Sequence, residues 1–150
     1  DIVTALNAHG WGLAWFEQTR SASGEISFLE HKMMGTREEE KKYGVAFSQP
    51  HALTLADLDG DGLPDVITGK RRWAHGPTGD VEPMATPVNY AFLLRRDASA
   101  PGGARFIPQL IDDASALGTQ VEAIDVNGDG IPDTLTASKL GVFVFLTKRK

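Results

Sequence analysis

A nine-residue stretch rich in aspartate and glycine constrains this chain more than any other feature. Residues 57–65 read Asp-Leu-Asp-Gly-Asp-Gly-Leu-Pro-Asp and lie between two short apolar runs. Oxygen groups at alternate positions, with no cysteine or histidine among them, suit a hard cation that takes about six to eight oxygen ligands. We therefore predict a calcium loop in which Gly62 supplies the sharp turn around the ion. Its expected ligands are the side chains of Asp57, Asp59, Asp61 and Asp65 and the carbonyl of Leu63.

Two other structures compete with this interpretation. An EF-hand begins with the same spacing, but its twelfth position needs a bidentate glutamate and is Thr68 here. The flanks favour strands instead, because residues 52–56 are apolar and partly alternating, Pro64 blocks a helix and residues 66–68 are all β-branched. A polar turn without a metal is the plainer alternative, since aspartate and glycine are common between strands. Closely spaced aspartates repel one another without a cation, which favours calcium.

The same motif occurs again nearer the C-terminal end. Residues 125–133 match it position for position, with an asparagine in place of one aspartate. The expected calcium ligands of this second loop are the side chains of Asp125, Asn127, Asp129 and Asp133 and the carbonyl of Ile131. The opening Asp-Ile-Val-Thr matches the end of the motif, so Asp1 is expected to be the last ligand of a third loop. The last aspartate of the motif recurs after 64 residues, from Asp1 to Asp65, and after 68 residues, from Asp65 to Asp133. This period suits a four-stranded propeller blade with insertions.

Asp-x-Asp-x-Asp-Gly-x-x-Asp between two strands, recurring at this period, resembles the FG-GAP and VCBS repeats. The resemblance spans essentially the whole chain, and it implies an all-β fold of β-propeller blades, each with four antiparallel strands and an aspartate-rich calcium loop. It implies a truncated blade and a linker with a short helix in residues 1–56, a complete blade in 57–124 and the start of the next in 125–150. About two and a quarter blades cannot close a ring. We therefore expect an incomplete propeller, or one completed by remaining blades or by other copies of the chain.

Alternating and β-branched runs predict further strands between the loops. These strands are expected in residues 13–18, 26–31, 90–94, 105–111, 121–125 and 142–146. The capping box at residues 36–39 predicts a helix of one or two turns that ends near Gly44. An insertion at residues 69–89 is too polar, and too rich in glycine and proline, to be core. Loops of that length inside a compact repeat are usually functional or disordered.

Composition excludes several classes of function. Hydrophobic residues make up 41% and charged residues 23% of the chain, as in ordinary soluble globular proteins. The net charge of −5 argues against nucleic acid as the main partner. Without cysteine there is no disulfide framework or thiolate site, and no run of about eighteen apolar residues predicts a membrane span. Because calcium is abundant outside cells, we expect an extracellular or periplasmic protein.

Three of the four histidines have distinctive neighbours in loop-like segments or at the start of a strand. They are His9 in Ala-His-Gly-Trp-Gly, His51 in Ser-Gln-Pro-His-Ala and His75 in Trp-Ala-His-Gly-Pro-Thr-Gly-Asp. Loops at one rim of a propeller converge on its channel, so these imidazoles can meet there. The charged residues expected near them are Lys70, Arg71, Arg72 and Asp80. Three imidazoles with an open position suit Zn²⁺ or another transition metal. The alternative is that each histidine caps a turn or packs against a tryptophan.

The segments around these histidines resemble FG-GAP proteins of the planctomycete type, and they are broadly similar to the propeller domain of aldos-2-ulose dehydratases. Those enzymes use a bound metal to dehydrate keto-sugars. The resemblance implies that His9, His51 and His75 are metal ligands or acid/base groups, which polarise a carbonyl or move a proton beside it.

Two functions remain open at this point. The first is a calcium-binding segment that binds a carbohydrate or protein ligand, with Trp11, Trp15 and Trp73 as sugar-stacking candidates, although Trp15 is expected in the core. The second is a fragment of a metal-dependent sugar lyase or isomerase that uses the histidines and a second divalent metal such as Zn²⁺. Imidazoles that converge on a common point favour the enzyme, whereas histidines on separate faces favour the binding segment.

Overall fold

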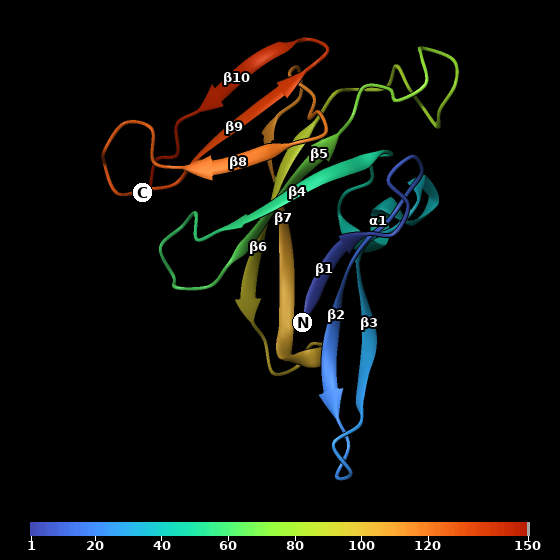
Figure 1. Cartoon of the computed structure of the whole chain (residues 1–150), viewed down its shortest axis with the longest axis vertical. Coiled ribbons are helices and arrows are strands. Elements are labelled where there is room, and N and C mark those ends of the chain that lie inside the picture. Colours follow the sequence, from blue (N-terminus) through green and yellow to red (C-terminus); the bar gives the residue numbers. More distant parts are fainter. Residues whose placement is uncertain (150) are drawn as a thin grey trace.

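The protein is built mainly from antiparallel strands, as shown by a computed structural model that describes residues 1–149 (Figure 1). Within these residues, ten strands form three separate sheets of three, four and three strands, and the chain completes one sheet before it enters the next. The all-β class expected from the sequence is therefore confirmed. Within residues 1–149, no helix has the length and apolar character needed to cross a membrane.

The sheets follow one another along the chain. The first contains β1 (Ile2–Ala5), β2 (Leu13–Arg20) and β3 (Ile26–Met34) in that order. The second contains β4 (Pro50–Ala56), β5 (Asp65–Lys70), β6 (Asn89–Arg96) and β7 (Ala104–Asp112) in that order. The third contains β8 (Val121–Ile124), β9 (Asp133–Ser138) and β10 (Gly141–Phe145), with β9 in the middle. Each strand expected from the alternation of residues is present, and most extend further than the pattern predicts.

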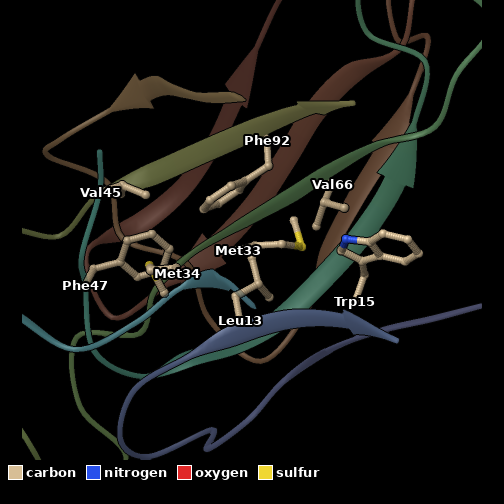
Figure 2. Packing of buried hydrophobic residues seen from close by; sticks show 8 residues of the cluster. All are labelled: Leu13, Trp15, Met33, Met34, Val45, Phe47, Val66 and Phe92. Atoms are coloured by element: carbon tan, nitrogen blue, oxygen red, sulfur yellow. The ribbon is translucent and has the colours of Figure 1, made fainter. Parts of the chain in front are cut away.

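Strand β5 is the centre of the molecule, and all six of its residues are buried. Its neighbours Val66 and Ile67 point to opposite faces, because side chains alternate along a strand. Val66 packs into a cluster with residues of the first sheet, as Figure 2 shows. Ile67 packs into a second cluster with Leu117, which precedes the third sheet along the chain, and with Val121, the first residue of β8. The second sheet is therefore covered on both faces, which fixes the loops of all three sheets relative to one another.

The segment between the first and second sheets carries the short helix expected from the sequence. A turn of 3₁₀ helix, η1 (Arg37–Glu39), runs directly into α1 (Glu40–Tyr43). The backbone N–H of Thr36 donates to Glu39 Oε2 at 3.1 Å, which completes the predicted capping box. Gly44 ends the helix in the left-handed conformation, with φ of 76°. A second 3₁₀ turn, η2 (Pro101–Gly103), precedes β7.

The structure sets the bounds of the polar insertion in the second sheet. The insertion was expected over residues 69–89, but Gly69 and Lys70 continue β5 and pair with Asn89 and Pro50. Asn89 in turn begins β6. The connecting loop therefore covers residues 71–88, and we refer to it as the β5–β6 loop.

Candidate functional site

The first aspartate loop brings three of its four carboxylates together. Oxygen atoms of Asp57, Asp59 and Asp61 lie within 4.8 Å of one another. Gly60 and Gly62 adopt positive φ values of 82° and 84°, and their N–H groups donate to Asp57 Oδ1 at 2.7 Å and Oδ2 at 3.1 Å. The aspartate at the first position therefore folds the loop backbone around the carboxylate cluster.

The fourth aspartate of the motif, Asp65, anchors the loop to the sheet. It is fully buried at the start of β5, where its two carboxylate oxygens accept the N–H groups of Leu58 at 3.0 Å and Leu94 at 2.9 Å. Burial raises the pKa of Asp65, and these two hydrogen bonds oppose the rise. Because a carboxylate has about four lone-pair sites, Asp65 keeps acceptor capacity beyond these two bonds.

The second loop repeats this arrangement. Asp125 accepts the N–H groups of Gly128 at 2.7 Å and Gly130 at 2.8 Å, and these bonds lower its pKa. Asp133 is buried and accepts the N–H groups of Val126 at 3.1 Å and Thr147 at 2.8 Å, as Asp65 does in the first loop. The two loops that share the sequence motif therefore also share the same pattern of hydrogen bonds.

Four further predicted residues have equivalent places in the two loops or in the truncated third motif. Leu63 and Ile131 each donate an N–H to the aspartate two residues earlier, at 2.9 Å in both loops. Asn127 donates through Nδ2 to Asp129 Oδ2 at 3.0 Å, so an amide replaces the carboxylate that stands at Asp59 in the first loop. Asp1 accepts the N–H of Gln18 at 2.8 Å, which corresponds to the contact of Asp65 with β6.

An arginine distinguishes the first loop from the second. Arg95 on β6 donates to Asp59 Oδ2 and also to Asp61 Oδ2, at 2.9 Å for the latter. Lys148 holds the corresponding place after β10, one residue beyond the N–H that Asp133 accepts, and it makes no ion pair within residues 1–149. Sequence reasoning missed Arg95 because it lies 34 residues from Asp61 and belongs to no recognisable motif.

At the other end of β4 and β5, the three predicted histidines come together. His9 lies between β1 and β2, His51 near the start of β4 and His75 in the β5–β6 loop. The ring centroid of His9 lies 4.7 Å from that of His75 and 5.3 Å from that of His51. The N–H of Gln49 donates to the carbonyl of Gly10 at 2.7 Å, which holds the start of β4 against the loop that carries His9.

A buried carboxylate orients His75. The side chain of Asp80 is only 3% exposed, and its Oδ1 accepts a hydrogen bond from His75 Nδ1 at 2.8 Å. Its Oδ2 accepts the N–H groups of Ala74 at 2.5 Å and His75 at 2.8 Å. These bonds, led by that of the His75 N–H, hold the pKa of Asp80 well below its usual range. An ionised Asp80 keeps the proton of His75 on Nδ1, so Nε2 presents a lone pair.

His51 is suited to remain neutral. Burial lowers its pKa, and the positive charge of Arg71 and the neighbouring His9 lower it further. Because the ordinary pKa of histidine already lies near 6.5, a lowered value leaves His51 uncharged at neutral pH. A neutral imidazole has one nitrogen lone pair, which can bind a metal or accept a proton.

The donor set at this end fits a transition metal. Ligand atoms of His9, His75 and Asp80 lie within 4.8 Å of one another, and His51 adjoins His9. Imidazole nitrogen suits zinc, copper, iron and nickel, and a histidine that ligates a metal almost always donates its other N–H to a carboxylate or carbonyl. Asp80 supplies that carboxylate to His75. The predicted histidines, together with Asp80, therefore form a candidate divalent-metal site.

The other residues expected near the histidines have varied positions. Lys70 is buried beneath the β5–β6 loop, where Nζ donates to Ser48 Oγ at 2.8 Å, and burial lowers its pKa to about 8. Ser48 and Gln49 both donate to the carbonyl of Val81, at 2.8 Å and 3.0 Å, and so fasten this loop over the start of β4. Arg71 lies close enough to His51 to lower its pKa.

The three tryptophans also differ in their surroundings. Trp15 is 8% exposed and stacks on His31 at a centroid distance of 4.2 Å, so it belongs to the core. The guanidinium of Arg37 covers Trp11 at 5.4 Å from the ring centroid. Trp73 is partly exposed in the β5–β6 loop, two residues before His75. Trp11 and Trp73 each lie two residues from a predicted histidine along the chain, Trp11 after His9 and Trp73 before His75.

Comparisons with protein-family models, with curated protein sequences and with solved structures found no match to this chain. The function must therefore be inferred from the geometry of the two kinds of site.

Proposed function

We propose that this chain is a calcium-binding segment of a secreted β-propeller and holds a divalent-metal centre for a lyase or isomerase reaction on a sugar. The observation that carries this proposal is the meeting of His9, His51 and His75 at one end of the sheets. Histidines on separate faces would have favoured a segment that only binds. The class of substrate follows the resemblance to FG-GAP proteins that act on keto-sugars.

The arrangement of the three sheets supports the propeller. The second sheet has four antiparallel strands in sequence order, which is the form of a propeller blade. The first sheet holds the counterparts of β5 to β7, and the third those of β4 to β6, as the repeated aspartates indicate. On this proposal, remaining blades or other copies of the chain complete the ring. The two aspartate loops bind calcium, and the availability of that ion outside cells suits a secreted protein.

The chemistry at the histidine end follows from its donors. A bound Zn²⁺ or similar ion would polarise the carbonyl oxygen of a sugar. His75 is held for ligation through Nε2 by its bond to Asp80, and His9 stands between the other two rings. His51, which is neutral, takes a proton from the carbon beside the carbonyl. Returning that proton to the former carbonyl carbon, while the proton of the adjacent hydroxyl passes to the former carbonyl oxygen, gives isomerisation. Passing it instead to a hydroxyl that departs from the next carbon, as a carbon–carbon double bond forms, gives loss of water.

A titration with Co²⁺, a spectroscopic substitute for Zn²⁺, tests the metal centre. We expect one visible-absorbing site per chain, with affinity reduced by roughly tenfold to a hundredfold in Asp80→Asn, as is typical when an orienting carboxylate is removed. His75→Ala should lose the spectrum. The matched control is His31→Gln, because His31 stacks on Trp15 away from the cluster. Equal spectra in His75→Ala and the unmodified chain would overturn the proposal.

A second candidate is a segment that binds carbohydrate or protein without chemistry. The partly exposed Trp73 near His75 favours it, since aromatic rings stack on sugars. The variant His51→Ala distinguishes the two candidates when turnover of an aldos-2-ulose and binding of the sugar are both measured with the metal-loaded chain. Loss of turnover with retained sugar binding supports the enzyme, whereas absent turnover in the unmodified chain supports the binding segment.

A further inference from the structure

A small cleft lined by positive charge lies beside the histidine end. Its volume is about 210 Å³, and its charged lining residues are Arg71, Arg72 and Lys139. The remaining lining residues are Leu117, Gly118, Thr119, Ala137 and Ser138, all neutral. A cleft with three cations and no carboxylate in its lining is suited to an anion.

The three cations have no acidic partner among the residues that the structure describes. The ion pairs formed within residues 1–149 involve other lysines and arginines, or His31 and His75. Trp73 brings two of the cations together, because Arg72 Cζ lies 5.4 Å and Lys139 Nζ 5.6 Å from its ring centroid. Lys139 Nζ also donates to the carbonyl of Trp73 at 3.1 Å. Two like charges held against one ring repel each other, and a bound anion would relieve that repulsion.

The cleft and the histidines belong to the same end of the sheets. Lys139 lies in the turn between β9 and β10, which is the counterpart of the loops that carry His9 and His75. Arg71 and Arg72 begin the β5–β6 loop, and the charge of Arg71 reaches His51. A sugar bound at the histidines can therefore extend one of its substituents into the cleft.

We infer that the sugar recognised at this end carries an oxyanion, a carboxylate or a phosphate, which Arg71, Arg72 and Lys139 bind. This inference rests on the proposed function and narrows its substrate class to sugar acids or sugar phosphates. Guanidinium groups match the paired oxygens of both anions, and the ammonium of Lys139 adds a point charge. A neutral sugar would leave the three charges without a counter-ion.

Calorimetric titration with D-galacturonate, D-galactose 6-phosphate and D-galactose tests the inference, with the chain both metal-free and loaded with Zn²⁺. We expect at least one anionic sugar to bind roughly tenfold or more tightly than galactose, as for charge-assisted hydrogen bonds. The tighter of the two identifies the anion. The double variant Arg72→Gln/Lys139→Gln should remove this preference and leave the affinities for galactose and Zn²⁺ unchanged. Lys41→Gln, an exposed cation on α1, is the matched control.

Equal binding of the three sugars would overturn the inference, as would an anion preference that survives in the double variant. Circular dichroism of the double variant shows whether it is folded, and retained Zn²⁺ binding shows that the histidine end is intact. Failure of the metal centre is seen separately, as absent Zn²⁺ binding in the unmodified chain. The preference for an anionic sugar in the metal-free chain remains measurable in that case.

Discussion

The two ends of the sheets are built in different ways. Each aspartate loop is one continuous segment whose side chains bond to N–H groups of their own loop. The histidine end draws His9, His51 and His75 from three segments, and these meet only because the first sheet packs on the second. An ion site of the first kind is encoded locally. A site of the second kind exists only in the folded protein, so on the proposed function metal affinity there would report on the packing of the sheets.

Removal of calcium should have the largest effect on the molecule. Each loop that binds calcium a hundredfold above its Kd stabilises the folded state by about 2.7 kcal/mol. Two loops together correspond to a fall in Tm on the order of 10 °C in EGTA, for a domain of this size. Melting followed by circular dichroism measures this fall, with Mg²⁺ as the control ion. A melting curve that EGTA leaves unchanged contradicts the calcium assignment of both loops.

The buried aspartates provide the next largest effect. Asp65→Asn and Asp133→Asn each turn an acceptor of two N–H groups into a side chain that can place an NH₂ against one of them. We expect a loss of about 3 kcal/mol in each variant, because a buried donor is left unpaired. Urea unfolding in EGTA measures this loss without any contribution from calcium. Asp61→Asn, at an exposed position, is the matched control and should change stability little. Equal losses in all three variants would refute the anchoring role.

Lys70 lies at the other end of β5 from Asp65, and its burial predicts a pH dependence. The pKa of Lys70 is about 8 in the folded protein, below its ordinary value of 10.5. Between these values the unfolded chain holds the proton and the folded chain does not, so stability increases as the pH rises. The cost of the buried charge is fully present below pH 8. It is relieved by about 3 kcal/mol as the pH rises toward 10.5.

The variant Lys70→Met isolates this contribution, because tyrosines and other lysines titrate in the same range. Unfolding free energies of both chains, measured from pH 7 to pH 10.5, should converge as the pH rises. We expect Lys70→Met to be the more stable chain at pH 7, since replacing a buried charge by an apolar side chain is often stabilising. A constant difference between the two chains across this range would show that Lys70 has an ordinary pKa.

The strands and the short helix were largely predictable from the sequence because their signals are local. Alternation and β-branched residues marked the strands, and the capping box at Thr36 marked the helix, as the structure has them. The bounds of the insertion were not predictable in the same way. Gly69 and Lys70 are residues that strands usually lack, and here they continue β5 only through pairing with Asn89 and Pro50.

The candidate sites also differ in whether local sequence spacing predicts them. The clustering of Asp57, Asp59 and Asp61 follows from spacing alone. The meeting of the histidines was expected from the convergence of loops at one rim of the implied propeller and not from spacing, because no local rule relates His9, in a loop of the first sheet, to His51 and His75 of the second. Asp80 was expected near the histidines, but its bond to His75 depends on the path of the β5–β6 loop. Arg95 was missed altogether, since only the pairing of β5 with β6 brings it to the aspartates.

Arg95 also gives the smallest predicted effect, and the one that separates the two aspartate loops. Its guanidinium pairs with the carboxylates of Asp59 and Asp61, so it would compete with a bound calcium ion for their oxygens. Arg95→Gln should raise calcium affinity at the first loop a few-fold, on the order of 1 kcal/mol, measured calorimetrically in a chain whose second loop carries Asp125→Ala. In EGTA the free energy of unfolding of the same variant should fall by a few tenths of a kcal/mol or less, because exposed ion pairs contribute little to stability. Lys148→Gln, at the corresponding place after β10, should change neither quantity. A gain in calcium affinity together with a loss of stability in EGTA would show that Arg95 neutralises the aspartates when calcium is absent. A loss of calcium affinity in Arg95→Gln would show instead that Arg95 supports the loop that binds the ion.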